Sequence, residues 1–415
     1  MSKPKIYLYA EALTHIRQLT LYASLETAKN EHTKILLSSD KKVITAIHDE
    51  ESSSIYLPTQ ISGTANVTFP TDKRTEISAR LQIDDVDQLK PADDDAGSIE
   101  VPWSAGDLTT NTSVRCKSCG ADILSAGKVT VWKDLPSTHW AELMDFWFCH
   151  KPHDDPSNEQ HAAESKGFAP TSKFTASPGA GLVDTVSFLL HEKDCQNLKL
   201  FKHASRAGAY VVKCFGCGTT IGSSQENEDS RRLVKSRLQV VPDSNRDSES
   251  FPAATFVCGQ LLSLIESSVT RRVVVHADNR AGTHVEEDEG LMLWIFNPDI
   301  YYSSSKRGPT AHRAMKVFYK VVANPVKFLD ANSTTYEELV VTEEDFVDFR
   351  KTLEESTNIL PQSARRFQDW EVGLLDRWEK TATGLAKMDE NPLNKKVDEG
   401  FELFKLPAGM QELYM

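Results

Sequence analysis

Two short segments share one pattern and organise the chain: residues 115–120 read Arg-Cys-Lys-Ser-Cys-Gly, and residues 213–218 read Lys-Cys-Phe-Gly-Cys-Gly. Two cysteines at this spacing can both bind one cation at about 2.3 Å, and the glycine that follows allows a tight backbone turn. Two such knuckles provide four sulfur ligands, the number that a closed tetrahedral zinc site requires. We therefore expect one structural zinc ion bound by Cys116, Cys119, Cys214 and Cys217.

The separation between the knuckles is unusual for a zinc ribbon. Cys119 and Cys214 are separated by 94 residues, whereas the two pairs of a ribbon are usually about 15–20 residues apart. The alternatives are two separate sites or two redox-active pairs. If one ion binds all four sulfurs, it closes a long insert at both ends and has no open position for activating water.

The composition of the chain is that of a globular protein. It has 415 residues, 40% hydrophobic and 26% charged, with a net charge of −13, which fits two or three domains. The acidic balance argues against direct nucleic-acid binding, which needs clustered Lys and Arg. The apolar stretches are far shorter than the about 20 residues that cross a bilayer, and the first ten residues do not resemble a signal peptide. We expect an intracellular protein with protein partners and no membrane span, in the cytoplasm, with the nucleus as a second candidate.

The expected fold class is α+β, in three regions. Residues 1–100 form a β-rich domain that ends in an acidic linker at 84–100, and that linker can also be read as a docking element. Residues 101–230 contain the knuckles and the insert between them. Residues 231–415 form a mixed α+β region that ends in amphipathic helices. The predicted strands are 5–9, 34–37, 43–47, 54–57, 65–69, 75–83, 238–241, 273–276, 291–296 and 314–322.

Four segments are predicted to be helical: 135–147, 255–267, a helix that opens at Thr342, and 363–380. The sequence Thr-Glu-Glu-Asp at 342–345 resembles a capping box. An aromatic stripe such as the one in 363–380 packs into a core or binds a partner. The expected apolar faces are Trp140, Leu143, Met144 and Trp147 in the first helix, Phe346, Phe349 and Leu353 in the third, and Phe367, Trp370, Leu374 and Trp378 in the fourth.

Cys149 and His150 are adjacent at the carboxyl end of the first of these helices, after Phe148. A thiol becomes a useful nucleophile when an imidazolium or another positive charge lowers its pKa, although the carboxyl end of a helix acts in the opposite direction. Three interpretations stay open: Cys149 is a catalytic nucleophile, it is a small buried residue, or Cys149 or His150 replaces one of the four cysteines as a metal ligand. Cys195 and Cys258 are expected to be inert thiols.

The order of these motifs resembles that of the ubiquitin-conjugating-enzyme-binding proteins, which are described as HECT-like ubiquitin-protein ligases. The shared order is the first knuckle, the Pro-Ser-Trp helix, the Cys-His pair and the second knuckle. The resemblance implies a ubiquitin-protein transferase that binds a ubiquitin-charged conjugating enzyme and promotes transfer to lysines of a protein substrate. It implies Cys149 as the acceptor thiol, Trp140, Trp147 and His150 as partner-binding residues, and a HECT-like region at 231–415.

Two classes of function therefore remain. The chain is either an E3 ligase that forms a thioester at Cys149, or a zinc-containing scaffold that binds a conjugating enzyme or stabilises a client without covalent chemistry. A third interpretation, a thiol oxidoreductase, requires a reversible dithiol and no tightly bound metal. The sequence contains no Gly-x-Ser-x-Gly elbow, Walker loop, Rossmann glycine pattern or His-Glu-x-x-His motif, so hydrolase, nucleotide-binding and dehydrogenase functions lose support.

Overall fold

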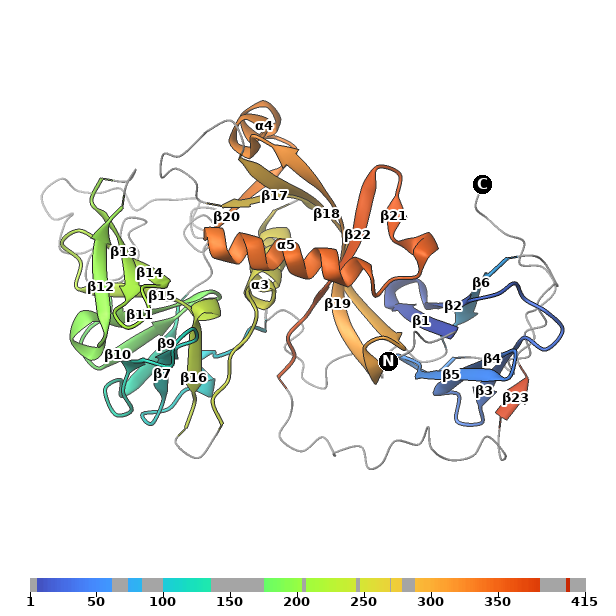
Figure 1. Ribbon diagram of the computed structural model, residues 1–415. Helices are drawn as coiled ribbons and strands as arrows, with labels where there is room; N and C mark the ends of the chain where they lie inside the picture. The colour runs from blue at the N-terminus through green and yellow to red at the C-terminus, as the bar shows by residue number, and fades with distance from the viewer. Residues whose placement is uncertain are drawn as a thin grey trace, which may run out of the picture.

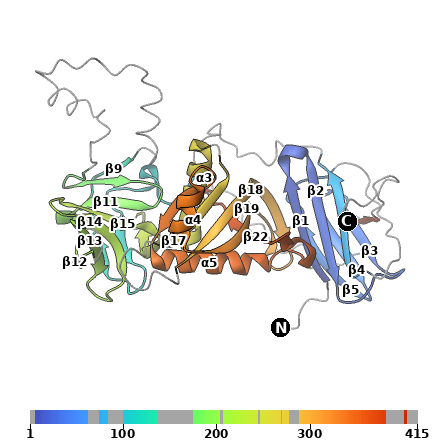
Figure 2. The same cartoon turned by 90° about the horizontal axis from the view of Figure 1, so that it is seen from above.

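The computed structural model describes residues 6–61, 74–83, 100–135, 175–203, 207–243, 247–268, 270–277, 288–380 and 401–403. These residues form an elongated, β-rich molecule with three α-helices (Figure 1). The unit that carries the cysteine knuckles lies at one end, the helices lie in the middle, and the amino-terminal strands lie at the other end (Figure 2). None of the helices in these ranges has the length and apolarity needed to cross a membrane.

The largest sheet joins amino-terminal and carboxyl-terminal segments of the chain. Its strands are β1 (Ile6–Leu13), β2 (Gln18–Leu25), β6 (Glu76–Gln82), β17 (Arg272–Ala277), β18 (Glu289–Ser304), β19 (Gly308–Ala323), β20 (Glu337–Val341), β21 (Arg366–Phe367) and β22 (Trp370–Asp376). The order is β21-β22-β19-β18-β1-β2-β6, and β17 pairs with both β18 and β20. Because β18 is 16 residues long, its first half pairs with β17 and its second half pairs with β1.

A second sheet covers the amino-terminal strands. It contains β3 (Lys34–Ser38), β4 (Val43–His48), β5 (Glu51–Tyr56) and β23 (Phe401–Leu403), in the order β23-β3-β4-β5. Burial alternates along β2, which is the pattern of a strand with one covered face. Leu19 and Leu21 on that face share a core with Ile35 and Ile44 of the second sheet.

The central unit packs two sheets around one core. The seven-stranded sheet has the order β12-β13-β14-β15-β11-β10-β9, and the three-stranded sheet has the order β16-β7-β8. Trp103, Phe188 and Phe256 lie in their shared core, and Cys116 and Cys214 belong to it as well. The strands are β7 (Ser113–Cys116), β8 (Asp122–Leu124), β9 (Val131–Asp134), β10 (Ala180–Val183), β11 (Ser187–His191), β12 (Leu198–Lys202), β13 (Ala209–Cys214), β14 (Thr220–Gln225), β15 (Ser230–Val234) and β16 (Leu238–Val241).

Helices α3 (Ala253–Ser267) and α5 (Glu343–Thr357) cover one face of the largest sheet (Figure 1). Both were predicted from the sequence, and both predictions are confirmed. The Thr342 side chain accepts a hydrogen bond from the backbone N–H of Asp345 and so caps α5. Phe346, Phe349 and Leu353 on its apolar face are buried. A shorter helix, α4, spans Pro325–Asn332.

The predicted helix at 363–380 is wrong. The segment forms the hairpin β21-β22, with Gln368 in the left-handed region (φ 54°) at its turn. Trp370 and Leu374 are four residues apart, and an interval of four also places side chains on one face of a strand, because the strand period is two. Trp378 lies beyond the end of β22. Val372 and Leu374 pack on one face of β22 and Leu375 on the other. In a helix, Val372 and Leu374 could not pack on one side and Leu375 on the opposite side against the same neighbouring residues.

The predicted strands that fall within the described ranges are confirmed. The strand at 65–69, most of the acidic linker and nearly all of the helix at 135–147 lie outside those ranges. The region boundaries near residues 100 and 230 stay predictions. The pairing of β1 with β18, through Tyr9 opposite Ser304, was not predicted.

Candidate metal centre

Each cysteine knuckle is the turn of a β-hairpin. β7 ends at Cys116 and β8 begins at Asp122, while β13 ends at Cys214 and β14 begins at Thr220. The two turns have equivalent hydrogen bonds. The N–H of Cys116 donates to the carbonyl oxygen of Ala121 at 2.8 Å, and the N–H of Cys214 donates to that of Thr219 at 2.9 Å. The repeated sequence pattern therefore corresponds to a repeated backbone structure.

The glycine after each pair is required by its backbone conformation. Gly120 has φ +73° and Gly218 has φ +77°, and no atom lies within 4 Å of the place where a Cβ would stand. The requirement is therefore the left-handed backbone and not a lack of space. In each turn the glycine N–H donates back to the carbonyl oxygen of the first cysteine, Cys116 or Cys214.

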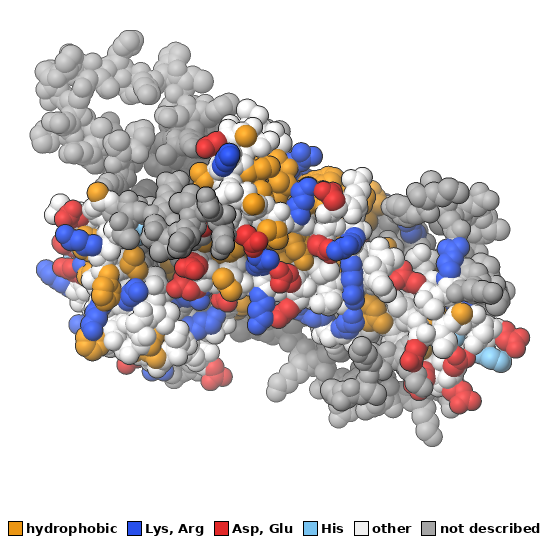
Figure 3. Space-filling view, turned by 45° about the horizontal axis from the view of Figure 1, so that its top comes forward, with side chains coloured by type: hydrophobic (Ala, Val, Ile, Leu, Met, Phe, Trp, Pro, Cys, Tyr) orange, Lys and Arg blue, Asp and Glu red, His pale blue; other side chains and the backbone are white. Residues whose placement is uncertain are grey.

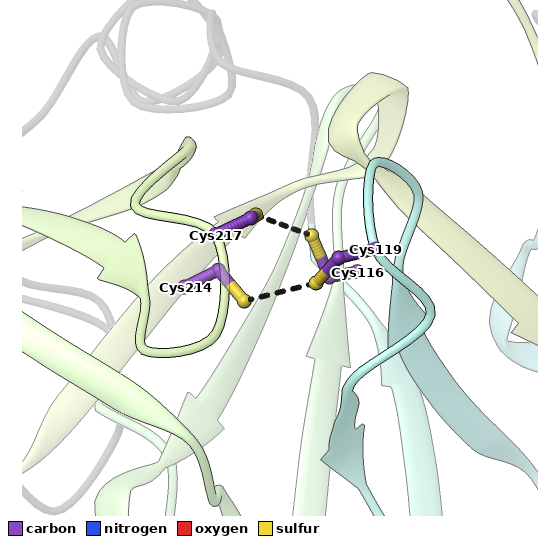
Figure 4. A group of neighbouring side chains, drawn as sticks. All are labelled: Cys116, Cys119, Cys214 and Cys217. Atoms are coloured by element: carbon purple, nitrogen blue, oxygen red, sulfur yellow. Dashed lines mark hydrogen bonds between the residues drawn. The ribbon is translucent and has the colours of Figure 1, made fainter.

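The four sulfur atoms meet where the two hairpins face each other (Figure 4). All four Sγ atoms lie within 4.8 Å of one another. Cys116 Sγ is 3.7 Å from Cys217 Sγ, and Cys119 Sγ is 3.6 Å from Cys214 Sγ. Four sulfurs around one ion, with bonds of about 2.3 Å, would be about 3.8 Å apart. The prediction that these cysteines come together is confirmed, and their arrangement is compatible with a bound metal ion.

The sulfurs differ in their surroundings. Cys116 and Cys214 are buried, whereas Cys119 and Cys217 are exposed. Burial raises the pKa of the Cys116 thiol to about 12. Hydrogen bonds from the Thr219 side chain and backbone lower the pKa of Cys217 to about 6. The contacts with Thr219 therefore favour the thiolate form of Cys217. Sequence reasoning missed Thr219, although it directly follows the second Cys-Gly pair.

Lys117, inside the first knuckle, ties the centre to the rest of the molecule. Its backbone N–H donates to the carbonyl oxygen of Arg237 at 3.1 Å. Its ammonium group donates to the carbonyl oxygen of Phe251 at 2.8 Å. Arg237 belongs to the 3-10 turn η5 (Lys235–Arg237) that precedes β16. The first knuckle is thus bound to the segment that leads from the central unit toward α3.

The other predicted site residues are distributed differently. Cys149, His150, Trp140 and Trp147 lie outside the described residues. Cys258 is buried in α3, and burial raises the pKa of its thiol to about 12. The thiol of the half-buried Cys195 also has its pKa raised to about 12, first by burial and then by the charge of Asp194. Neither thiol is a ready nucleophile near neutral pH.

Comparison with known proteins gives a family and two relatives. A family model described as "HECT-like Ubiquitin-conjugating enzyme (E2)-binding" matches residues 11–372. An uncharacterised protein of Schizosaccharomyces pombe is 23% identical over 293 residues, which cover 68% of this chain and 79% of that protein. An uncharacterised protein of Saccharomyces cerevisiae is 24% identical over 274 residues, which cover 65% and 71%. No solved structure matches the chain.

Proposed function

Because the chain belongs to the HECT-like family of ubiquitin-conjugating-enzyme (E2)-binding proteins, we propose that it is an E3 ubiquitin-protein ligase. It binds a ubiquitin-charged conjugating enzyme and promotes transfer of ubiquitin to lysines of a protein substrate. The observation that carries the proposal is the family match, which spans residues 11–372 and therefore includes both knuckles. The names of the two relatives state no activity, so the transfer step is part of the proposal.

The proposed route passes through Cys149. Its thiolate attacks the carbonyl carbon of the thioester on the conjugating enzyme, a new carbon–sulfur bond forms, and the enzyme's cysteine leaves as a thiolate. The neutral amine of a substrate lysine then attacks the carbonyl carbon of the new thioester, an amide bond forms, the carbon–sulfur bond breaks, and the Cys149 thiolate takes up the proton that the amine loses. Both steps exchange one acyl acceptor for another, so positioning of the reacting groups is the main requirement. Trp140, Trp147 and His150 are proposed to contact the conjugating enzyme.

The described cysteines support this choice of nucleophile by elimination. Four of the six belong to the cluster, and the thiols of Cys195 and Cys258 have pKa values raised to about 12. Among the described residues, no cysteine outside the cluster offers an accessible thiolate. If Cys149 does not form a thioester, the second candidate function follows: a scaffold that binds a conjugating enzyme and performs no covalent step.

For the metal centre we propose one structural zinc ion. Four thiolates satisfy the tetrahedral preference of Zn²⁺ and leave no position for substrate or water. The sulfur separations of 3.6 Å and 3.7 Å support this assignment. The ion holds the β7-β8 and β13-β14 hairpins together and takes no part in transfer. Elemental analysis of the purified protein should find about one zinc per chain, and a value near zero would overturn the assignment.

A charging assay tests the ligase proposal. The full chain is mixed with a ubiquitin-charged conjugating enzyme and separated on non-reducing gels. The wild type should form a ubiquitin adduct that reductant removes, Cys149→Ser should not form it, and Cys195→Ser should form it normally. Zinc content and melting temperature confirm that the variants are folded. Substrate ubiquitination that is unchanged in Cys149→Ser would exclude the thioester route, and binding to the conjugating enzyme without any ligation would favour the scaffold.

A further inference from the structure

The central unit has an open edge at β12. This strand pairs with β13, and no other described strand pairs with it. An edge strand presents unpaired backbone N–H and C=O groups along one side. Four of the five side chains of β12, from Lys199 to Lys202, are exposed. The edge is therefore accessible to another extended chain.

Apolar side chains gather at this edge although they face solvent. Leu200 is 42% exposed and Phe201 is 49% exposed, and Phe215, from the second knuckle, is 59% exposed. The backbone N–H of Phe215 donates to the carbonyl oxygen of Asn197 at 2.8 Å, which fixes the knuckle beside the start of β12. An edge that only avoided aggregation would carry charges without exposed aromatic rings. The rings point to a binding role.

The same edge is basic in a chain of net charge −13. Lys199 and Lys213 are opposite each other in the β12-β13 ladder, and Lys202 lies at the far end of β12. Within the described ranges none of the three forms an ion pair with a carboxylate. Basic and hydrophobic side chains lie next to each other at the end of the molecule that carries β12 (Figure 3). We call this set the β12 surface: Lys199, Leu200, Phe201, Lys202, Lys213 and Phe215.

We propose that the β12 surface binds an extended acidic segment of a partner protein, which adds to the sheet as a further strand beside β12. Main-chain hydrogen bonds to the open edge provide affinity in such strand addition, and alternate side chains provide specificity. Here Asp or Glu side chains of the segment pair with the three lysines, and its apolar side chains contact Leu200, Phe201 and Phe215. This binding activity is additional to the proposed ligase function and does not depend on it.

Two other occupants fit the surface less well. A second copy of the chain would place two rows of lysines against each other, and like charges at a strand interface are unfavourable. Single-stranded nucleic acid would need free ring faces for base stacking. The Lys199 ammonium lies over the Phe215 ring at 4.0 Å, and the Lys213 ammonium lies over the Phe201 ring at 5.5 Å. Each cation covers one face of its ring, which leaves fewer ring faces for stacked bases.

A displayed library of random dodecapeptides, selected on the full-length protein, tests the proposal. The selection is repeated on Lys199→Glu/Lys202→Glu and on Lys128→Glu/Lys133→Glu. The second variant makes the same change in charge at exposed lysines in and before β9, the opposite edge of the same sheet. Wild type and the β9 variant should enrich peptides with alternating acidic and apolar residues, and the β12 variant should not. A peptide synthesised from the enriched sequences should bind the β12 variant at least tenfold more weakly than it binds the wild type. N-methylation of alternate backbone nitrogens of this peptide should abolish its binding.

Several results would overturn the proposal. Enrichment of peptides without acidic residues, or equal enrichment on the β12 variant, excludes the charge pairing. Equal binding of the N-methylated peptide excludes strand addition. If a labelled twelve-nucleotide poly-dT bound more tightly than the selected peptide, the β12 surface would be assigned to nucleic acid. A concentration-dependent dimer that Lys199→Glu/Lys202→Glu abolishes would assign it to a second copy. Circular dichroism and zinc content keep a folding failure distinguishable from a binding failure.

Discussion

Asp345 joins helix α5 to the turn that holds the first knuckle, and its replacement by Asn tests that connection. The carboxylate accepts a hydrogen bond from the Arg237 guanidinium at 2.6 Å and another from the Ser236 hydroxyl at 2.8 Å. The Asp345 side chain is 9% exposed and that of Arg237 is 16% exposed, so the pair is mostly shielded from water. Asn has the same shape and still accepts from Ser236, so the variant removes mainly the charge.

The expected loss of stability follows from these contacts. Breaking a buried ion pair by removing one partner costs about 3–5 kcal/mol, because the other charge is left uncompensated. Here Asp348 remains 3.4 Å from Arg237 and is 55% exposed, so the guanidinium keeps a weaker partner. The retained Ser236 hydrogen bond reduces the cost further. We therefore expect Asp345→Asn to lower the free energy of unfolding by about 2–3 kcal/mol.

Urea unfolding followed by tryptophan fluorescence measures this loss. Glu354→Gln is the control, because it removes the partner of an exposed Arg350–Glu354 pair within α5 and should cost less than about 1 kcal/mol. A second readout follows from the hydrogen bond that Lys117 donates to the carbonyl oxygen of Arg237: zinc should transfer to a chelator faster in Asp345→Asn. A loss no larger than that of the control, with unchanged zinc transfer, would refute the connection between α5 and the metal centre.

Three further predictions concern single groups. Burial lowers the pKa of Lys235 from 10.5 to about 8, so the unfolded chain binds more protons than the folded protein between these pH values. The free energy of unfolding of the wild type should therefore rise by about 3 kcal/mol relative to that of Lys235→Met as the pH increases from 8 to 10.5. Urea unfolding across this range measures the difference, and a constant difference would contradict the reasoning. Zinc binding should strengthen with pH, because the Cys116 and Cys119 thiols, whose pKa values are raised, must lose their protons, and more steeply below about pH 6, where Cys217 is protonated too. Calorimetry in two buffers counts the protons, and pH-independent affinity would contradict the assignment. A Cβ at residue 222 would stand 2.1 Å from the carbonyl oxygen of Arg232, so Gly222→Ala should lower the free energy of unfolding by about 3 kcal/mol or more. At Gly106 the nearest atom to a Cβ would be 3.9 Å away, so the control Gly106→Ala should change the melting temperature little.

The cysteine cluster was predictable from sequence because its information is local. Each Cys-x-x-Cys-Gly segment specifies its own turn through the φ of Gly120 or Gly218, and sulfur chemistry then requires the two turns to meet. The cap and the apolar face of α5 could be predicted for the same reason, because each depends on residues within the helix and just before it. In 363–380, however, an apolar interval of four fits both a helix and a strand. The strand forms because the segment pairs with β19, which is distant in the sequence and becomes a neighbour only when the chain folds.

The long-range contacts had no comparable signal. Nothing in the sequence of β1 shows that Tyr9 lies opposite Ser304, or that Asp345 reaches Arg237, because any of many carboxylates can pair with a given arginine. The β12 surface was missed for a related reason. Its sequence, Leu-Lys-Leu-Phe-Lys at 198–202, does not show which strands neighbour it, and only the order of strands in the sheet shows that β12 is at the edge.

The position of the proposed metal site gives it a role in the fold of the long insert between the two knuckles. Cross-linking the ends of a loop of about 100 residues restricts the unfolded chain by about 4–5 kcal/mol in the loop-entropy description. An ion bound by the four sulfurs would close a loop of this size between Cys119 and Cys214. Hydrogen bonds hold Phe215 of the second knuckle beside β12 and Lys117 of the first knuckle beside η5, and the proposed ion would join the two knuckles. Loss of zinc should therefore weaken acidic-peptide binding and the connection to α5 together, whereas Asp345→Asn should weaken only the second. If zinc removal left peptide binding intact, the metal site would stabilise only the first knuckle and its contacts, and pairing within the sheet would be sufficient to position the β12 surface.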